Sequence, residues 1–402
     1  MRRAALAAVL ICLAVAPAAR AAWLAGDLHV HTCFSHDVFC GPLDQPFQIE
    51  PGDDPAEFAA EEVQYLTDPE NLQQLYAYGM TVGERFAEAS LRGLDYLAIT
   101  DHNDMRSVAA PGFGGAGVIG VPGYEDSVRG HAQVLGAGRV LDNGDGSAAA
   151  LRALADELHG LGGVLQANHP GYTTDGPFAS CNQDPGSLHW TYGYDVSVDS
   201  IEVWNPTASV SDAEAYLECW LQRGARVAAT GGGDSHWAST VAAQGVGNPT
   251  TWVLADSRSA AGILAAIRAG RTSISRLAPA QGGAPLLLEV RDADGSWANA
   301  IGEDVAPGAA MRVRSQSAPA SGLVTVRANG LDLVHEAVLR PGGAIVFSAP
   351  ATGWMRARLH AVGSAAAGLP GCAHELGGNE KASTCAYDHT LLGMTSPAYV
   401  HG

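Results

Sequence analysis

The sequence predicts an α/β protein, with a barrel of parallel strands followed by a small antiparallel β domain. Short apolar runs alternate with helical stretches over residues 22–276, and this alternation is typical of parallel sheets that close into barrels. Side chains suited to metal binding follow several of these runs, as expected at the carboxyl ends of barrel strands. From residue 277 to 402 short apolar runs are separated by Gly, Pro and polar turns, which is typical of a small β-sandwich.

The apolar runs define the expected elements. Strands of the first region are expected at residues 23–30, 94–99, 117–122, 133–136, 163–167, 200–204 and 225–230. Helices are expected at 81–91, 148–161, 213–223 and 259–269, and C-terminal strands at 286–291, 311–315, 323–329, 344–348 and 355–359. Residues 38–80 interrupt the alternation as a long acidic insert, which predicts either a functional lid or a surface loop held by Cys40.

The N-terminus has the features of a secretory signal peptide. Arg2 and Arg3 precede an apolar run over residues 4–16, and Ala19-Arg20-Ala21 forms a small-x-small cleavage site. The run is too short to be a typical transmembrane helix. We therefore expect residues 1–21 to be removed and the protein to be periplasmic or secreted, with an N-terminal membrane anchor as the alternative. No later stretch is apolar enough to span a bilayer.

Charge and cysteine content limit the possible partners. The formal net charge of −19 leaves no basic surplus for nucleic acid. Without Cys12 the exported chain has six cysteines, enough for three disulfides whose pairing the sequence does not fix. Short spacing favours Cys33–Cys40 and Cys372–Cys385, which leaves Cys181–Cys219; free buried thiols are the alternative.

Imidazoles and carboxylates gather near the predicted strand ends. His29 and His31 close the first strand, where alternation puts both side chains on one face. The full set comprises His29, His31, His102, Glu125, His131, His169, Glu202, Asp234 and His236. One such His is more often a hydrogen-bonded structural residue, but a whole set at strand ends is hard to explain as packing. Nitrogen and oxygen ligands of this kind suit zinc, iron or manganese.

Four segments resemble, in order, the motifs of the PHP family, named for polymerase and histidinol phosphatase. They are Asp27-Leu28-His29-Val30-His31-Thr32 with Ser35 and Asp37 after it, Thr100-Asp101-His102-Asn103, Asn168-His169-Pro170 and Gly233-Asp234-Ser235-His236. The resemblance covers residues 23–275. Gly123-Tyr124-Glu125, Gly130-His131, residues 201–203 and residues 265–275 also resemble the CehA/McbA-type metallohydrolases.

The resemblance implies a distorted (β/α)7 barrel with a centre of two or three divalent metal ions, zinc, manganese or iron. Its ligands would be His29, His31, Glu125 and Asp234 at the first metal, Glu125, His131 and His169 at the second, and Asp37, His102 and His236 at the third. His36 is an alternative to Asp37. Asp234, Glu125 and His236 would contribute most directly to catalysis, while Asp101, Asn168 and Glu202 would orient ligands from behind.

These residues predict an exported metal-dependent hydrolase of small-molecule esters. The expected nucleophile is a hydroxide that bridges metals, because metal binding lowers the pKa of water to near neutrality. The resemblance favours phosphate esters, so a phosphoesterase is the leading hypothesis. Hydrolysis of carboxylic or carbamate esters, as in the CehA/McbA type, is the alternative. A metal-containing surface binding protein is a third. Cations near the metals would favour phosphate esters, and the nearest to the motifs in sequence are Arg106, Arg129 and Arg226.

Overall fold

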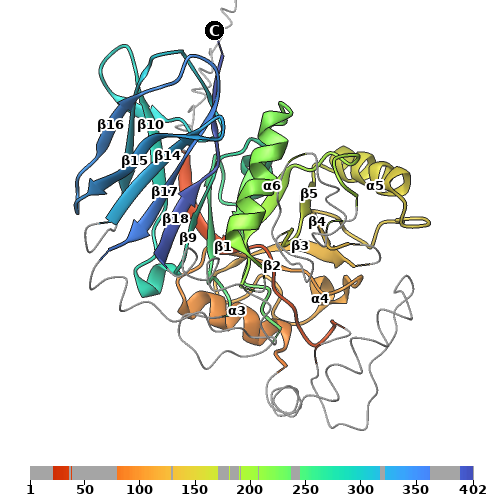
Figure 1. Ribbon diagram of the computed structural model, residues 1–402. Helices are drawn as coiled ribbons and strands as arrows, with labels where there is room; N and C mark the ends of the chain where they lie inside the picture. Colours follow the sequence, from red (N-terminus) through yellow and green to blue (C-terminus); the bar gives the residue numbers. More distant parts are fainter. Residues whose placement is uncertain are drawn as a thin grey trace, which may run out of the picture.

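The computed structural model is a mixed α/β structure built on one large sheet (Figure 1). It describes residues 21–35, 38, 79–127, 130–170, 181, 190, 192–206, 208–236, 245–316, 322–362 and 390–401. The expected signal peptide and most of the insert therefore lie outside the described residues. A second, four-stranded sheet has the order β11-β10-β13-β16. Among the described residues, no helix is both long and apolar enough to cross a membrane.

The first region contains most of the elements that the apolar runs predicted. Its strands are β1 (Ala22–Asp27), β2 (Tyr96–Ile99), β3 (Ile119–Asp126), β4 (Ala132–Leu135), β5 (Val164–Ala167), β6 (Ser200–Trp204), β7 (Ala228–Gly231), β8 (Thr250–Ala255) and β9 (Thr272–Ser275). Its helices are α3 (Val82–Leu91), α4 (Arg106–Ala109), α5 (Ala148–Gly160), α6 (Val210–Gln222) and α7 (Ala260–Arg268). The sequence did not predict α4, β8 or β9.

The strand directions correct the expectation of a closed parallel barrel. Strands β1, β2 and β3 are parallel, and so are β5, β6 and β7, but β4 runs antiparallel to both of its neighbours. Only residues 127–131 connect β3 to β4, and a parallel crossover needs about a dozen residues or more. Strand β8 is also antiparallel to β1, and β7 ends the order of paired strands, so the sheet is not closed.

Side-chain hydroxyl groups form hydrogen bonds with the backbone amides and carbonyls along the outer edge of β7. Thr251 on β8 bonds both the amide and the carbonyl of Gly231, each at 2.7 Å. Thr272 on β9 donates to the carbonyl of Ala229, and Ser396 accepts from the amide of Ala229, both at 2.7 Å. Buried backbone groups need such partners. Side chains therefore replace a strand-to-strand ladder along this edge.

The C-terminal region supplies strands to both sheets. They are β10 (Leu286–Arg291), β11 (Trp297–Asn299), β12 (Asp304–Val305), β13 (Ala310–Ser315), β14 (Gly322–Ala328), β15 (Leu331–Leu339), β16 (Ile345–Ser348), β17 (Gly353–Ala361), β18 (Leu391–Thr395) and β19 (Ala398–Val400). Strand β18 pairs with β9, which joins the end of the chain to the first region. The division at residues 276 and 277 into a barrel and a β-sandwich-like domain stays a prediction.

A buried ion-pair network also links α6 to the C-terminal strands. Arg356 on β17 donates to Glu214 and, at 2.8 Å, to Glu218. Arg327 on β14 donates to both carboxylate oxygens of Glu218, at 2.6 and 2.7 Å. Burial raises the pKa of Glu218, but these guanidinium groups hold it below its usual value. Because each charge has an opposite partner, the attraction between them offsets much of the desolvation free energy of burying them.

The disulfide prediction is confirmed in one case. Cys181 and Cys219 are bonded, with Cα atoms 5.3 Å apart, and Cys219 lies on α6. Cys33 is also in a disulfide. Its expected partner Cys40, and the expected pair Cys372–Cys385, lie outside the described residues.

We expect Thr251→Val to destabilise the protein by about 1–3 kcal/mol, because two buried backbone groups of Gly231 lose their partner. Urea unfolding with an unchanged m-value measures the loss. Thr352→Val is the matched control, because Thr352 is exposed and its change should stay within about 0.5 kcal/mol. Equal stability of Thr251→Val and the parent would contradict this role of the hydroxyl.

Candidate metal centre

The end of β1 places two imidazoles side by side. Val30 points into the apolar core and forms a parallel bridge with Ser235. Alternation along the extended chain then turns His29 and His31 to the opposite side. Both rings are fully buried, and their Nε2 atoms are 3.1 Å apart.

Glu125 stands at the centre of the imidazoles. It lies on β3, and an isolated parallel bridge with His102 brings these two residues together. Its Oε2 lies 3.3 Å from Nε2 of His29, 3.4 Å from Nε2 of His31 and 3.2 Å from Nδ1 of His102. Its Oε1 lies 3.0 Å from Nδ1 of His131 and 3.3 Å from Nε2 of His169. Each carboxylate oxygen thus faces a different group of imidazoles.

Asp234 completes the first group from the loop after β7. Its Oδ1 lies 3.2 Å from Nε2 of His29 and 3.3 Å from Nε2 of His31. Its backbone φ is +46°, and that of His169 is +25°, an unfavourable region for residues other than glycine. Such conformations gather at functional sites, where the surrounding structure holds them.

The glycines before Asp234 allow the backbone to approach the site closely. A Cβ atom on Gly232 would lie 2.4 Å from Oε1 of Glu202 and 2.4 Å from Cβ of His29. A Cβ atom on Gly233 would lie 2.7 Å from Oδ2 of Asp27. Larger residues at these positions would push the loop away from β1.

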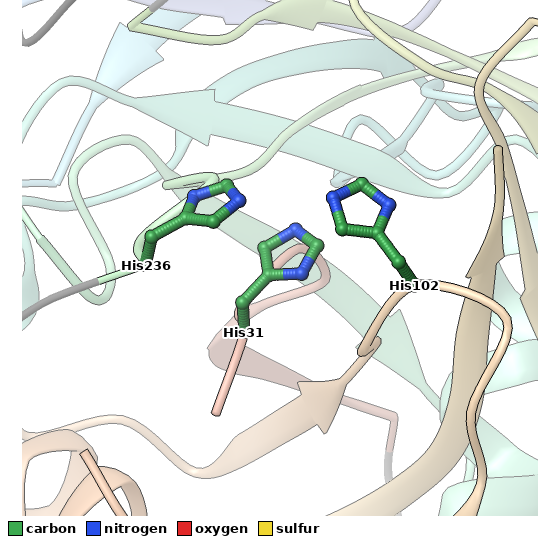
Figure 2. Close-up of side chains that lie close together, drawn as sticks. All are labelled: His31, His102 and His236. Carbon is green, nitrogen blue, oxygen red and sulfur yellow. The ribbon is translucent and has the colours of Figure 1, made fainter. Parts of the chain in front are cut away.

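Two residues predicted for the third metal, His102 and His236, lie beside His31, which was predicted for the first. Figure 2 shows His31, His102 and His236 converging from three segments of the chain. The ring of His31 is 4.5 Å from that of His102 and 4.0 Å from that of His236, centre to centre. Asp37 and its alternative His36 lie outside the described residues.

The donor atoms fit divalent metal ions. Ligand atoms about 2.1 Å from a metal lie roughly 3.0–3.4 Å from one another in octahedral or tetrahedral geometry, as the contacts of Glu125 and Asp234 do. Candidate metal-binding groups share residues with one another: His29, His31 and Glu125; His102, Glu125 and His131; His29, His169 and Glu202; His31, His102 and His236. Oε2 of Glu125 is buried and accepts no hydrogen bond from the described part of the chain, as expected for an atom reserved for a cation.

The charges of the site are strongly coupled. Burial opposes ionisation of Glu125 and Asp234, but the surrounding imidazoles hold both pKa values well below their usual range. Burial works to lower the pKa of His29, yet Asp234, Glu125 and Glu202 hold it well above its ordinary value. Burial, with His236 and His102 nearby, lowers the pKa of His31. Ionised carboxylates beside imidazoles form a site that favours added positive charge.

Two of the residues expected behind the ligands, Glu202 and Asn168, contact candidate ligands, whereas Asp101 binds Thr32 in the first motif. Glu202 accepts from the backbone amide of His169 at 2.9 Å, and its other oxygen lies 3.0 Å from Nδ1 of His29. Asn168 donates to Oε1 of Glu125 at 2.7 Å. Asp101 accepts from the amide and hydroxyl of Thr32, and burial raises the pKa of Asp101 to about 6.

Two residues around the site were not singled out from the sequence. Asp27 accepts from the amides of His29, Gly233 and Gly247, at 3.0, 3.0 and 2.7 Å, and burial raises its pKa to about 6. It lies in the first motif, but the sequence does not reveal these distant amides.

The second is Arg85, whose side chain is fully buried. Its Nε donates to the carbonyl of His31 at 2.9 Å, and its Nη2 to that of Ser235 at 2.8 Å. The guanidinium thus ties together the two segments that carry the ligands. Helical spacing could have revealed it, because Arg85 shares one face of α3 with Val82, Phe86 and Ala89.

Comparisons with known proteins say less about the function of the chain than the geometry of the site does. No family model matches the chain, and no curated protein matches it. One solved structure is a two-domain protein from Bacteroides vulgatus containing a "predicted PHP-like metal-dependent phosphoesterase", with a TM-score of 0.42 and 15% identity over 85% of this chain and 91% of that one. Another, named "a putative metal-dependent phosphoesterase" from Bifidobacterium adolescentis, has a TM-score of 0.31 and 14% identity over 55% of this chain and 90% of that one. Similarities this low do not assign a family.

Replacing Glu125 tests its place between the groups. We expect Glu125→Gln to bind at least one metal equivalent fewer than the parent, because a neutral amide offers one oxygen where the carboxylate offers two. Elemental analysis after dialysis against Zn²⁺ measures this. Glu157→Gln on the exposed face of α5 is the control and should keep full metal content. Full metal content in Glu125→Gln would exclude a shared carboxylate.

Metal uptake should release protons. The raised pKa of His29 favours its protonated form in the metal-free protein, and a ligand imidazole must be neutral. Affinity for Zn²⁺ should therefore rise as the pH is raised from 6 to 8, up to about tenfold per pH unit for each proton displaced. Calorimetry in two buffers of different ionisation enthalpy measures the proton count, and a count of zero would contradict the assignment.

Proposed function

We propose that the protein is a metal-dependent hydrolase of small-molecule esters, with phosphate esters as the leading substrates. The observation that carries the proposal is the position of Glu125, whose two oxygens face different groups of imidazoles. A shared carboxylate of this kind is typical of hydrolases with two adjacent metal ions. The four sequence motifs support a PHP-type enzyme, and residues 123–125, 130–131, 201–203 and 265–275 support a relation to the CehA/McbA type. We also propose that it is exported, on the basis of residues 1–21 alone.

The ligands divide into sets that share side chains. One ion would be held by His29, His31, Glu125 and Asp234, a second by Glu125, His131 and His169, and a third by His102, His236 and Asp37. The ligand types fit zinc, manganese or iron. When bound, such ions lower the pKa of a coordinated water to near neutrality and polarise the ester under attack.

The exposure of the ligands indicates the side from which a substrate approaches. The side chains of His29 and His31 are fully buried, whereas those of His131 and His236 are 14% and 10% exposed. A substrate would therefore meet His131, His236 and Asp234 first. His29 and His31 lie beneath, held in place through Glu202 and Ser35. This arrangement fixes the ligands from behind and leaves the outer side for the ester.

The two described cations nearest to the motifs, Arg106 and Arg226, are already paired with carboxylates. Arg106 donates to Asp104 at 2.6 Å through Nε and lies over the ring of Phe34. Arg226 lines a separate cavity of about 230 Å³, where it pairs with Asp304. Arg129 lies outside the described residues. Among these described groups, a phosphate would therefore find no unpaired cation in Arg106 or Arg226, and carboxylic or carbamate ester hydrolysis is the second candidate.

Metal removal tests the proposed chemistry. A chelator should abolish turnover of p-nitrophenyl phosphate and bis-p-nitrophenyl phosphate, and added Mn²⁺, Zn²⁺ or Fe²⁺ should restore it. His131→Ala should lower kcat/KM by about 100-fold or more, as for other groups that stabilise transition-state charge. The matched control is His335→Ala, because His335 is 71% exposed and lies on β15.

The same assay distinguishes the alternatives. Faster metal-dependent turnover of p-nitrophenyl acetate or a naphthyl carbamate would favour the carboxylic or carbamate ester hydrolase. Metal binding without turnover of either ester class would favour a metal-containing binding protein. Undiminished turnover without metal would contradict the proposal as a whole.

A further inference from the structure

A chain of buried hydrogen bonds runs from the interior of the sheet to Glu125. Gln166 on β5 donates through Nε2 to Oδ1 of Asn168 at 3.0 Å. Asn168 in turn donates through Nδ2 to Oε1 of Glu125 at 2.7 Å. At the other end, Oε1 of Gln166 accepts from the hydroxyls of Ser200 at 3.1 Å and Thr230 at 2.7 Å. All five side chains are buried.

Glu125 sets the direction of every bond in this chain. As a metal ligand it is ionised and can only accept, so Asn168 must present its NH₂ group. The carbonyl oxygen of Asn168 then faces Gln166, which must present its own NH₂ group. The carbonyl oxygen of Gln166 then faces the hydroxyls of Ser200 and Thr230, which donate to it. The orientation of both amides thus follows from the network.

We propose that Gln166 is a positioning residue for the metal centre, acting through Asn168 on the shared carboxylate of Glu125. This inference rests on the proposed function, because it gives a purpose to a fixed orientation of that carboxylate. Anchoring Oε1 of Glu125 on the side of β5 leaves Oε2 directed toward His29, His31 and His102. Without the hydrogen bond from Asn168, the carboxylate of Glu125 could rotate so that both oxygens face one group of imidazoles.

The location of Gln166 suits this role. Positions 166 and 168 lie two residues apart along an extended segment, so their side chains emerge on the same face. Ser200 on β6 is the direct neighbour of Gln166 in the parallel register, and Thr230 on β7 follows one strand further. Three adjacent strands therefore hold the amide rigidly, and rigid support from behind is known to tune metal affinity.

Gln133 provides a matched control. It is the cross-strand partner of Gln166 on β4 and is equally buried, but its NH₂ group donates to the carbonyl of Leu28 and to Thr100. Substitution of either glutamine by Met removes a buried amide of similar size and should lower the free energy of unfolding. Only the Gln166 substitution removes the bond to Asn168.

The test is the affinity for Zn²⁺, measured by competition with a chromogenic chelator in the full chain. We expect Gln166→Met to weaken binding about 10- to 100-fold, and Gln133→Met to change it less than about threefold. In an Asn168→Ala background the Gln166→Met change should add less than about twofold, because the two residues act in series. Should Gln166→Met fail to fold, Thr230→Val carries the same test, since it removes the shortest bond to Gln166.

The outcomes separate this inference from the proposed function. Zn²⁺ binding is measured without substrate, so absence of phosphoesterase turnover alone would leave the role of Gln166 standing. Unchanged binding in Gln166→Met would overturn it even in an active phosphoesterase. Equal weakening by Gln133→Met, or effects of Gln166→Met and Asn168→Ala that multiply, would also overturn it, because both results indicate a general loss of structure.

Discussion

The carboxylate of Glu125, buried among imidazoles from four segments of the chain, is the group on which the arrangement of the site depends. An isolated buried carboxylate is costly, and its pKa would rise. Here the imidazoles hold the pKa of Glu125 well below its usual range, although burial opposes this. The same contacts require the imidazoles to converge on it. The strand ends, the close approach of the backbone at Gly232 and the buried polar side chains behind the imidazoles all serve to bring these rings together.

Several buried groups keep the segments in place. Asp27 accepts hydrogen bonds from the amides of His29, Gly233 and Gly247, while Arg85 donates to the carbonyls of His31 and Ser235. Gly232 permits these segments to approach within a distance that no side chain would allow. Along β7, threonine and serine hydroxyls take the place of a paired strand. The candidate metal centre is therefore supported by buried polar groups that form hydrogen bonds with one another.

The sequence identified side chains that lie together better than it identified the architecture around them. Apolar runs that end in His or Asp mark strand ends, and the ends of adjacent strands meet, so His29, His102 and Asp234 could be brought together without a structure. The direction of β4 was missed, although the five residues between β3 and β4 were too few for a parallel crossover. Strand β15 was missed because its apolar and polar residues do not alternate regularly, although Asn329-Gly330 before it is a typical hairpin turn.

Other features could not be inferred from the sequence in principle. The partners of Gln166 in Ser200 and Thr230 lie 34 and 64 residues away along the chain. The threonines of β8 and β9 weaken the apolar pattern by which strands are recognised, yet they are needed to satisfy β7. Such roles depend on the register of the sheet, which local patterns do not encode.

The central claim, that Glu125 joins two metal ions, is tested most directly by electron paramagnetic resonance of the protein saturated with Mn²⁺. Two ions bridged by one carboxylate lie about 3.5–4 Å apart, so their spins should couple. The account predicts the broadened spectrum of a coupled Mn²⁺ pair, which Glu125→Gln should convert to that of isolated ions. A spectrum of isolated Mn²⁺ ions alone, in the saturated parent protein, would contradict it.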